Sequence, residues 1–301
     1  MILVAGGTGF IGSAVVRRLV RDGQDVAVMT AHPRRSAARI AELGATVVAG
    51  DVLDAASLDR AVAGAEAVVQ ALTFPTFPVE KPSKRFTFEE FDHRGTERLV
   101  GAATRRGVKR YVYCSGAGAA PDGVESWFRA KWGGEEAVRT SGLEHVIMRP
   151  SWVYGPEDRA LNVFVALHRW LPFVPVIGPG TQRLQPAFID DVGQAFAQAA
   201  RAGGPVGTFE IGGPEVMSMD DVVRTMMEVR GRTKPVLHVP AALPKVAGLF
   251  LQYLPKRPLS ADAVSFLTGD ALADTRSLLE AFHLRLTPLR EGLATYLSSS
   301  H

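Results

Sequence analysis

The first twelve residues constrain the fold more than any other stretch of this 301-residue chain. An apolar run at residues 1–5 breaks into glycines and then into residues 13–20, where apolar side chains recur at helical spacing. The pattern predicts a strand, a tight turn and a helix. Because glycine lacks a Cβ and a helix N-terminus offers free N–H groups at its positive dipole end, this turn suits a pyrophosphate.

Gly7, Gly9 and Gly12 have the G-x-G-x-x-G spacing of dinucleotide-binding turns. The spacing alone is weak in a chain with 30 glycines, but the flanking strand and helix strengthen it. A phosphate loop of the ATPase kind is excluded because Ser13 follows Gly12 with no lysine between them. The alternative is a turn that serves only packing. We assign cofactor contacts here to Gly6, Thr8, Gly9, Phe10, Ile11 and Gly12.

Strands and helices alternate after this turn, which predicts an α/β fold with a Rossmann-type, doubly wound parallel sheet. The expected strands cover residues 25–30, 46–49, 67–71 and 111–114, and the expected helices cover residues 37–43, 58–62 and 92–104. The ligand of such a sheet lies at the carboxyl ends of the strands.

The end of the second strand normally carries the residue that reads the adenosine ribose. An acid there would indicate NAD, but this chain has Thr30, His32, Arg34 and Arg35 in that region. Because arginine pairs well with a 2′-phosphate, we favour NADP, with Arg34 as its main contact, and leave NAD open. The alternative is an ordinary solvated start to a helix.

Asp51 follows the third strand, where its carboxylate would accept from the adenine amino group, with Val52 beside it. Asp51 would equally serve as a helix cap, although Asp54 or Ser57 would fill that role. Further cofactor contacts are expected at Ala71, Leu72 and Thr73, at the end of the fourth strand, and at Pro150 and Val153.

Residues 73–90 break the alternation with prolines, phenylalanines and basic residues. A loop of this kind at the carboxyl edge of a sheet is either a lid over a ligand or a disordered excursion. Phe74, Phe77 and Phe86 favour the lid.

Ordered motifs along nearly the whole chain resemble the short-chain dehydrogenase/reductases. They include the opening glycine turn, residues 94–96, residues 107–115, residues 148–156, residues 188–192, residues 211–215 and the closing segment 259–297. The later motifs resemble the atypical group that contains the accessory subunit of respiratory complex I and its free-standing bacterial relatives. The resemblance implies a smaller C-terminal region that covers the nicotinamide and forms the substrate pocket.

Catalysis in the family that the chain resembles uses a serine, a tyrosine and a lysine four residues after the tyrosine. Ser115 and Lys131 match the serine and the lysine, but Trp127 occupies the tyrosine position. An indole N–H donates a hydrogen bond but does not replace a phenol as an acid or base. Lys131 is still suited to hold the ribose. The alternative interpretation of Lys131 is a solvated lysine on the surface of a helix. Ser115 either bonds the substrate or is a small residue that lets the cofactor approach.

Composition excludes several classes of function. Lys and Arg number 34 against 31 Asp and Glu, and no basic stripe interleaved with aromatics occurs, so we expect no nucleic-acid partner. The only cysteine, Cys114, excludes intrachain disulfides and agrees with a cytoplasmic location. The seven histidines lack metal-ligand spacing. No run is long enough to span a membrane. Peripheral membrane contact and the choice between monomer and homodimer stay open.

We expect an NAD(P)-binding domain at residues 1–155, interleaved with a smaller, mostly helical C-terminal substrate region at 156–301. Apolar segments 163–165, 170–177 and 246–251 suggest a lipophilic substrate or a partner surface. Two functions remain: an NADP(H)-dependent reductase of a lipophilic carbonyl, quinone or alkene, or a non-catalytic NAD(P)H-binding protein with a structural, assembly or redox-sensing role. An epimerase or dehydratase is disfavoured because those reactions also need the phenol.

Overall fold

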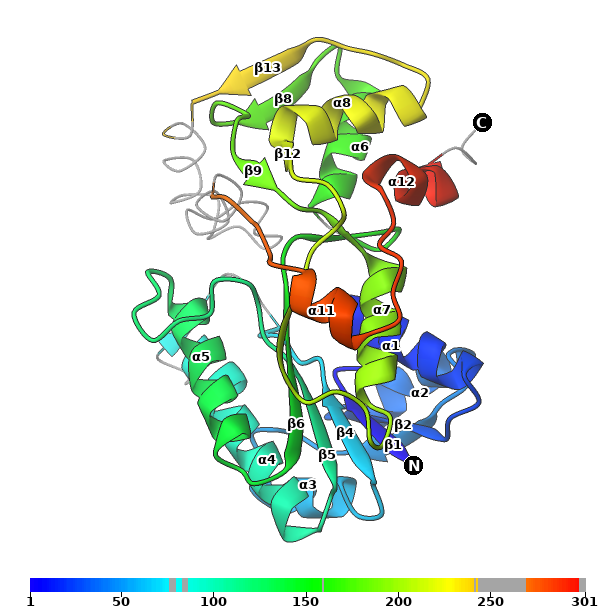
Figure 1. The fold of residues 1–301 in the computed structure, drawn as a ribbon, viewed down its shortest axis with the longest axis vertical. Helices are drawn as coiled ribbons and strands as arrows, with labels where there is room; N and C mark the ends of the chain where they lie inside the picture. The colour runs from blue at the N-terminus through cyan, green and yellow to red at the C-terminus, as the bar shows by residue number, and fades with distance from the viewer. Residues whose placement is uncertain (76–79, 83–85, 159, 241, 243–268, 298–301) are drawn as a thin grey trace.

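The computed structural model describes residues 1–75, 80–82, 86–158, 160–240, 242 and 269–297. A parallel sheet with helices on both faces forms the larger part, and a smaller part lies beyond the carboxyl ends of its strands (Figure 1). Three expectations of the sequence, those at Phe77, at residues 246–251 and at the start of the closing segment, lie outside the described residues.

The sheet has seven strands in the order β11-β6-β5-β4-β1-β2-β3, and every neighbouring pair is parallel. The strands are β1 (Ile2–Ala5), β2 (Val26–Thr30), β3 (Thr46–Ala49), β4 (Ala67–Gln70), β5 (Arg110–Cys114), β6 (Glu144–Pro150) and β11 (Gly207–Ile211). The strand order reverses between β1 and β4, which is where doubly wound folds bind their ligands. The predicted Rossmann-type fold is confirmed.

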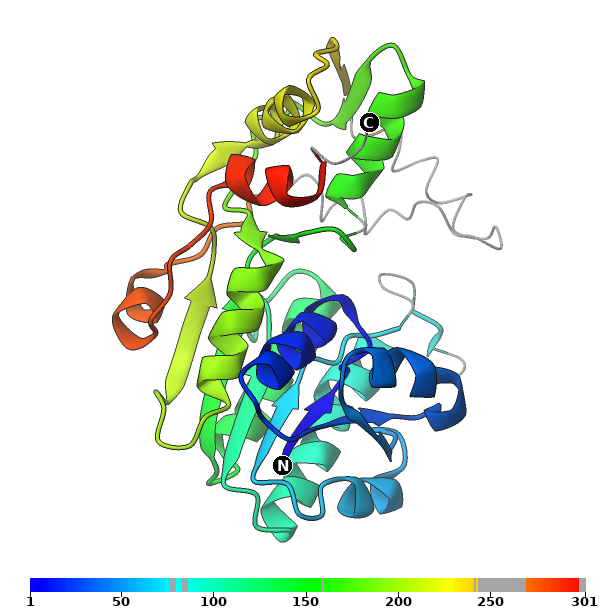
Figure 2. The same ribbon diagram turned by 90° about the vertical axis from the view of Figure 1, so that its right-hand side faces the viewer.

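Helices cover both faces of the sheet because its strands are buried on both sides. In β1, Ile2 and Val4 pack on one face, and Leu3 and Ala5 pack on the other. The first face carries α1 (Phe10–Arg21), α2 (Pro33–Glu42), α7 (Ile189–Ala199) and α11 (Arg276–Ala281); the second carries α3 (Ala55–Ala61), the π-helix η2 (Glu89–Arg94), α4 (Gly95–Arg105) and α5 (Ser126–Arg139). Helices α1 and α7 pack side by side, with Gly193 against the backbone of Ala14 (Figure 2).

The limits of the five strands that the sequence predicts agree with the structure to within a residue, but the helix starts differ. Helix α2 begins at Pro33, four residues before the predicted start, since proline loses nothing at the first helical position, where the N–H has no partner. Helix α3 begins at Ala55 because Asp54 caps it, accepting from the N–H of Ala56 at 3.1 Å. The helix predicted from residue 92 starts earlier, as the π-helical turn η2, and continues without a break into α4 at Gly95.

The smaller part has its own apolar core, built around Tyr154, Leu161, Val174, Val222 and Leu293. It consists of helices α6 (Leu161–Trp170), α8 (Met219–Val229) and α12 (Leu289–Leu297), with the strand pairs β7 (Val153–Tyr154) and β10 (Ala187–Phe188), β9 (Arg183–Leu184) and β12 (Met217–Ser218), and β8 (Val174–Ile177) and β13 (Val236–Val239). Because α7 and β11 return to the large sheet, the two parts interleave. The boundary at residue 155 stays a prediction.

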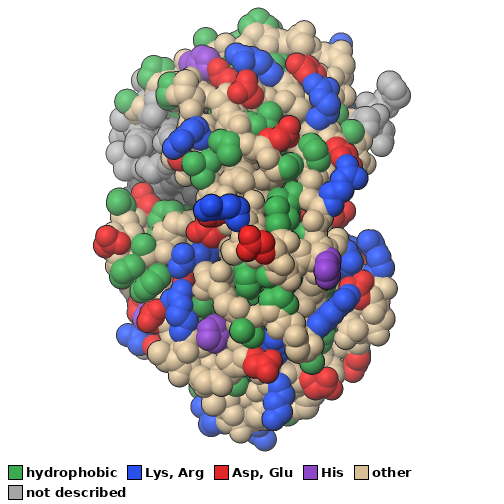
Figure 3. Space-filling model, in the orientation of Figure 1, with side chains coloured by type: hydrophobic (Ala, Val, Ile, Leu, Met, Phe, Trp, Pro, Cys, Tyr) green, Lys and Arg blue, Asp and Glu red, His purple; other side chains and the backbone are tan. Residues whose placement is uncertain are grey.

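Charged side chains of both signs are interspersed over the face in Figure 3, with no continuous basic stripe there. Among the described residues, no helix is long and apolar enough to cross a bilayer. The same residues contain no cluster of three or more His, Cys, Asp or Glu side chains placed to share a metal ion.

Candidate functional site

The glycine turn after β1 is closed by backbone contacts that only glycine allows. Gly6 has φ +87°, and a Cβ there would lie 2.5 Å from the carbonyl oxygen of Ala71. A Cβ on Gly12 would lie 2.1 Å from the oxygen of Gly6. These two glycines therefore shape the turn and join it to the end of β4.

Gly9 differs from its neighbours because it is exposed at the N-terminus of α1. A Cβ there would meet only the oxygen of Gly6, at 3.2 Å, and no side chain caps the helix. The amides of the first turn have no partner within a helix, so those of Phe10 and Ile11 are available to an anion. The turn thus fits a dinucleotide diphosphate: its inner glycines hold the shape, and its outer glycine leaves the approach open.

The end of β2 presents cations and no acid. Thr30 is used by the turn itself: its hydroxyl oxygen accepts from the N–H of His32 at 3.1 Å and lies 3.3 Å from the hydroxyl of Ser36. His32, Arg34 and Arg35 are exposed and, with Pro33, line a shallow hollow. Within the described part of the chain, neither arginine has an ion-pair or hydrogen-bond partner. These side chains suit a ribose phosphate.

Asp51 lies half-buried after β3. Its Oδ1 accepts from the N–H of Leu53 at 2.9 Å, and its own N–H donates to Ser57 Oγ at 3.0 Å. The helix-capping role that was open to Asp51 belongs to Asp54. Among the residues described, Asp51 Oδ2 forms no hydrogen bond. Val52 is buried, and a Cβ added to Gly95 would lie 3.1 Å from the Cβ of Val52.

Lys131 lies in the interior between α5 and the ends of β4 and β5. Its Nζ is 2.8 Å from Asp92 Oδ1 and donates to the carbonyl oxygens of Leu72 at 3.2 Å and Cys114 at 3.1 Å. The side chain is only 8% exposed, so the solvated alternative does not apply. An ammonium has three hydrogens, and all three are directed at protein oxygens.

The charge of Lys131 is maintained by its surroundings. Burial lowers the pKa of Lys131, but the neighbouring Asp92, followed by Tyr113 and Cys114, outweighs that effect, so its net pKa is raised. The ammonium therefore stays charged at neutral pH. Asp92, on η2, is 4% exposed, and its Oδ2 is buried with no hydrogen-bond partner. Asp92 was not among the residues predicted from the sequence.

The phenol of Tyr113 lies beside this lysine, with Lys131 Nζ 5.5 Å from the Tyr113 ring centroid. The ring is fully buried, and a Cβ on Gly134 would lie 2.3 Å from its hydroxyl oxygen. Burial raises the pKa of Tyr113 far above the ordinary value. Since it contacts no open surface and resists ionisation, Tyr113 does not substitute for the phenol that Trp127 replaces.

Ser115 points into the protein. Its hydroxyl donates to Glu135 Oε1 at 2.5 Å, and the fully buried carboxylate of Glu135 also accepts from Arg149 Nε at 2.8 Å, from Arg149 Nη2 at 2.6 Å and from Arg139. A carboxylate only accepts, so the proton of the Ser115 hydroxyl is directed to Glu135. Like Asp92, Glu135 was not among the residues predicted from the sequence.

Trp127 lies on the same face of α5 as Lys131, one turn earlier. Its ring stacks on Phe128, with centroids 3.8 Å apart, and covers Gly116, whose added Cβ would come within 3.1 Å. It joins an aromatic cluster with Phe74, Phe86, Phe88, Phe91 and Ala130. The loop residues Phe74 and Phe86 pack at 4.7 Å between centroids, so these two are held against α5.

The remaining predicted residues lie along the same carboxyl edge. Ala71 is bonded to β1 through its N–H, which donates to Ala5 at 2.8 Å, and Thr73 is exposed. Phe10, Ile11 and Val153 pack against the core of the smaller part. Pro150 is buried at the end of β6, and the oxygen of Pro150 accepts from the N–H of Ala117 at 2.9 Å.

The glycine turn leaves the amides of Phe10 and Ile11 without partners within the helix, and we call it the bare-amide turn. It lies where the strand order of a doubly wound sheet reverses, with a charged lysine nearby, and this combination defines a dinucleotide-binding protein. A sequence model of the NAD(P)H-binding family matches residues 6–167, which is more than half of the chain. The chain therefore belongs to the NAD(P)H-binding family. The relatives and solved structures described below agree with the predicted resemblance to the atypical short-chain dehydrogenase/reductases.

Two relatives are mitochondrial proteins named NADH dehydrogenase [ubiquinone] 1 alpha subcomplex subunit 9. The one from Arabidopsis thaliana is 29% identical over 291 residues, covering 91% of this chain and 71% of the relative. The one from Rattus norvegicus is 29% identical over 252 residues, covering 80% of this chain and 63% of the relative. The chain thus spans less than two thirds of the rat protein.

Solved structures share the fold. UDP-glucuronic acid 4-epimerase from Bacillus cereus superposes with a TM-score of 0.78 at 18% identity, covering 100% of this chain and 99% of that protein. An NADPH-dependent quinone oxidoreductase from Escherichia coli gives 0.75 at 20% identity, covering 98% and 99%. The nicotinamide cofactor is thus supported as a class, and the choice between NAD and NADP is not settled by these matches. The cytoplasmic location stays a prediction beside mitochondrial relatives.

Proposed function

We propose that the chain is an NADPH-dependent reductase of lipophilic acceptors, with quinones and other conjugated carbonyls or alkenes preferred to isolated ketones. The observation that carries the proposal is the buried, charged Lys131 at the carboxyl edge that also bears the bare-amide turn. NADPH, when bound, supplies a hydride. Every other part of the work falls to the chain's own residues.

Binding is divided among three groups of residues. The amides at Phe10 and Ile11 hold the diphosphate, and Arg34 pairs with the 2′-phosphate. Lys131 holds a ribose hydroxyl by giving up its longer carbonyl bond, the one to Leu72 at 3.2 Å, while Asp92 keeps the ammonium in place. Ser115, which the sequence predicts as catalytic, has its proton directed to Glu135, so we assign it no part in proton transfer.

Proton delivery determines the substrate class. The indole of Trp127 does not ionise, the Ser115 proton is directed to Glu135, and the Tyr113 phenol is buried. Lys131 has a raised pKa and releases its proton reluctantly. With no positioned acid among the residues that the structure describes, the oxyanion formed on hydride addition must be stabilised by conjugation until water protonates it. A quinone meets this condition, whereas an isolated ketone does not. The apolar aromatic cluster beside Trp127 suits a lipophilic ring.

The test measures NADPH consumption by its absorbance with a panel of quinones, enones and simple ketones of matched apolar size. We expect turnover with the conjugated acceptors, a KM for NADPH that rises in Arg34→Ala while the KM for NADH does not, and loss of activity in Lys131→Ala. Arg276→Ala, far along the chain and paired only with exposed Asp274, is the matched control. No turnover, together with wild-type cofactor binding by Lys131→Ala, would contradict the proposal.

A second candidate is a non-catalytic NAD(P)H-binding role in an assembly or as a redox sensor, with bound nucleotide stabilising the fold. Trp127 at the tyrosine position favours it, and the two mitochondrial relatives are named as subunits of a larger complex. NADPH should then raise the melting temperature without turnover, and Trp127→Tyr should create or raise activity. A wild type faster than Trp127→Tyr would exclude this candidate. The same proteins are to be used to determine whether the chain acts as a monomer, a homodimer or a subunit of a larger complex.

A further inference from the structure

Helix α6 exposes an apolar stripe to solvent. Val163, Ala166 and Trp170 share one face at intervals of three and four residues, with Leu167 half-buried beside them. Val163 is 52% exposed and Trp170 is 79% exposed, whereas the opposite face of the helix packs into the core of the smaller part. A tryptophan this exposed on an otherwise apolar stripe indicates a contact surface.

Cations surround the end of this stripe. Arg169 stacks over the Trp170 ring at 5.5 Å from its centroid. The segment between α8 and β13 adds Arg230, Arg232 and Lys234. That segment is fixed to the end of α6, because the carbonyl oxygen of Arg232 lies 2.8 Å from His168 Nε2, and Lys234 Nζ donates to the oxygens of His168 and Leu171 at 2.5 and 2.6 Å.

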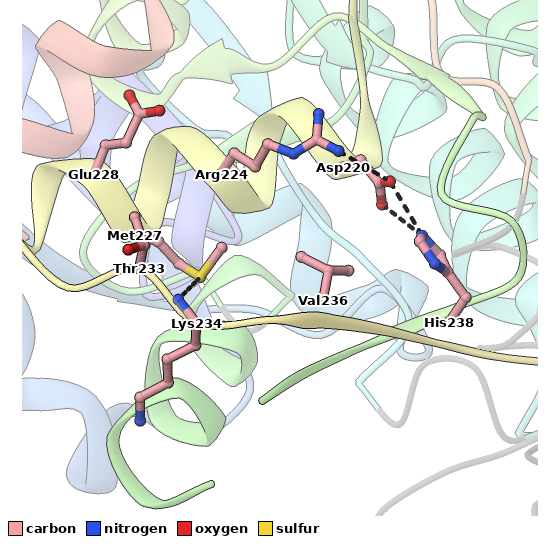
Figure 4. A pocket seen from close by; sticks show the side chains of 8 residues that line it. All are labelled: Asp220, Arg224, Met227, Glu228, Thr233, Lys234, Val236 and His238. Atoms are coloured by element: carbon pink, nitrogen blue, oxygen red, sulfur yellow. Dashed lines mark hydrogen bonds and ion pairs between the residues drawn. The ribbon is translucent and has the colours of Figure 1, made fainter. Parts of the chain in front are cut away.

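No acid balances these cations locally. Residues 160–178 and 229–240 contain no Asp or Glu, and within the described ranges none of the four cations forms an ion pair with a carboxylate. The nearest acid in the sequence, Glu228, is paired with Arg290. In the adjacent hollow between α8 and β13, Asp220 Oδ1 lies 2.9 Å from His238 Nε2. The side chain of Lys234 extends away from both residues (Figure 4).

Helix α6 and the segment between α8 and β13 belong to the smaller part, beyond the carboxyl ends of the sheet strands (Figures 1 and 2). Together they carry one surface, formed by Val163, Ala166, Trp170 and the four cations. We propose that it docks on a lipid bilayer that contains anionic headgroups. An exposed tryptophan belongs at the apolar–polar boundary of a bilayer, and the two exposed arginines beside it, Arg169 and Arg232, match lipid phosphates. Aliphatic residues in line with the tryptophan favour lipid over nucleic acid, which would need further stacking rings. The inference stands apart from the proposed reductase activity.

The test is co-sedimentation of the full chain with phosphatidylcholine vesicles, with and without phosphatidylglycerol, at low and high salt. We expect binding to the anionic vesicles that weakens with salt, and a loss of about fivefold in partitioning for each cation removed by Arg169→Gln or Arg232→Gln. Trp170→Ala should weaken binding at both salt concentrations. The matched controls are Arg285→Gln and Val124→Ala, which replace side chains that are 84% and 90% exposed elsewhere, and both should bind as wild type.

Circular dichroism melting checks that each variant is folded, which exposed substitutions should not change. Full-length folded protein that stays in solution beside anionic vesicles would overturn the proposal, as would equal binding by Trp170→Ala and wild type. Light scattering that reveals a homodimer dissolved by Trp170→Ala, or a nucleic-acid gel shift abolished by Arg232→Gln, would each assign this surface to another partner and also overturn it.

Discussion

Replacing Asp92 with asparagine should destabilise the fold through the charge it leaves on Lys131. The substitution keeps the size of the side chain, so it opens no cavity, but it removes the negative charge 2.8 Å from the ammonium. Both side chains are nearly inaccessible, at 3% and 8% exposure, so water does not compensate. Removing one partner of a buried ion pair costs about 3–5 kcal/mol. The two carbonyl bonds that remain, to Leu72 and Cys114, place the expected loss near the lower figure.

Denaturant unfolding at neutral pH measures this loss directly, and a thermal scan should show a fall in Tm of about 6 °C for about 3 kcal/mol. The double variant Asp92→Asn/Lys131→Met should recover more than half of the stability, because it removes the orphaned charge together with its partner. The control is Glu97→Gln on α4, whose pairing with Arg94 is solvent-exposed, so this substitution should leave the free energy of unfolding nearly unchanged.

The pH dependence gives an independent check of the same reasoning. The pKa of Lys131 is raised in the folded protein, so its contribution to stability is complete below its unfolded pKa of about 10.4 and is lost as the pH rises further. In Asp92→Asn, burial dominates and the folded pKa falls below the unfolded one, so the free energy of unfolding should rise with pH instead. A loss below about 1 kcal/mol at neutral pH, or parallel pH profiles for the two proteins, would refute the coupling.

Three further variants test the site. Gly12→Ala should cost about 1–3 kcal/mol in denaturant unfolding, because the new Cβ would lie 2.1 Å from the oxygen of Gly6; an unchanged midpoint would contradict the turn geometry. Gly9→Ala should fold but lose about tenfold or more in NADPH affinity by calorimetry, equivalent to about 1.4 kcal/mol, since its Cβ enters the open approach. Ser115→Ala should cost about 1 kcal/mol because Glu135 loses one donor, yet leave kcat for a quinone near the wild-type value; a large fall in kcat would make Ser115 a proton donor after all.

The sheet was predictable because its strands are buried on both faces. A parallel strand of this kind is a continuous apolar run, so β1 and β4 stand out as short hydrophobic segments bounded by turn residues. The turn after β1 was predictable because its glycines stand where a Cβ would collide with neighbouring backbone atoms, which is a local requirement. Helix starts were less certain because they depend on single residues such as Pro33 and Asp54.

The partners of the site residues were harder to predict because they come from distant segments. Asp92 reaches Lys131 from a helical turn 39 positions earlier in the chain, and no spacing rule links the two. A weaker signal was present: Asp92, Thr96, Leu99 and Ala103 recur at intervals of three and four and share the buried face. A carboxylate among such residues requires a buried partner. Glu135, four residues after Lys131 on α5, carries the same signal.

Trp127 shows why the missing phenol is more than a change of one functional group. Its indole fills the space over Gly116, stacks on Phe128 and completes the aromatic cluster that holds Phe74 against α5. A tyrosine there would be smaller and would leave part of that contact unmade, so restoring the phenol also loosens the wall of the site. Any activity gained by Trp127→Tyr would therefore be accompanied by a loss of packing around residue 127. It follows that the surroundings of Trp127 are fitted to the indole, which agrees better with substrates that need no positioned acid than with a tyrosine site damaged by one substitution.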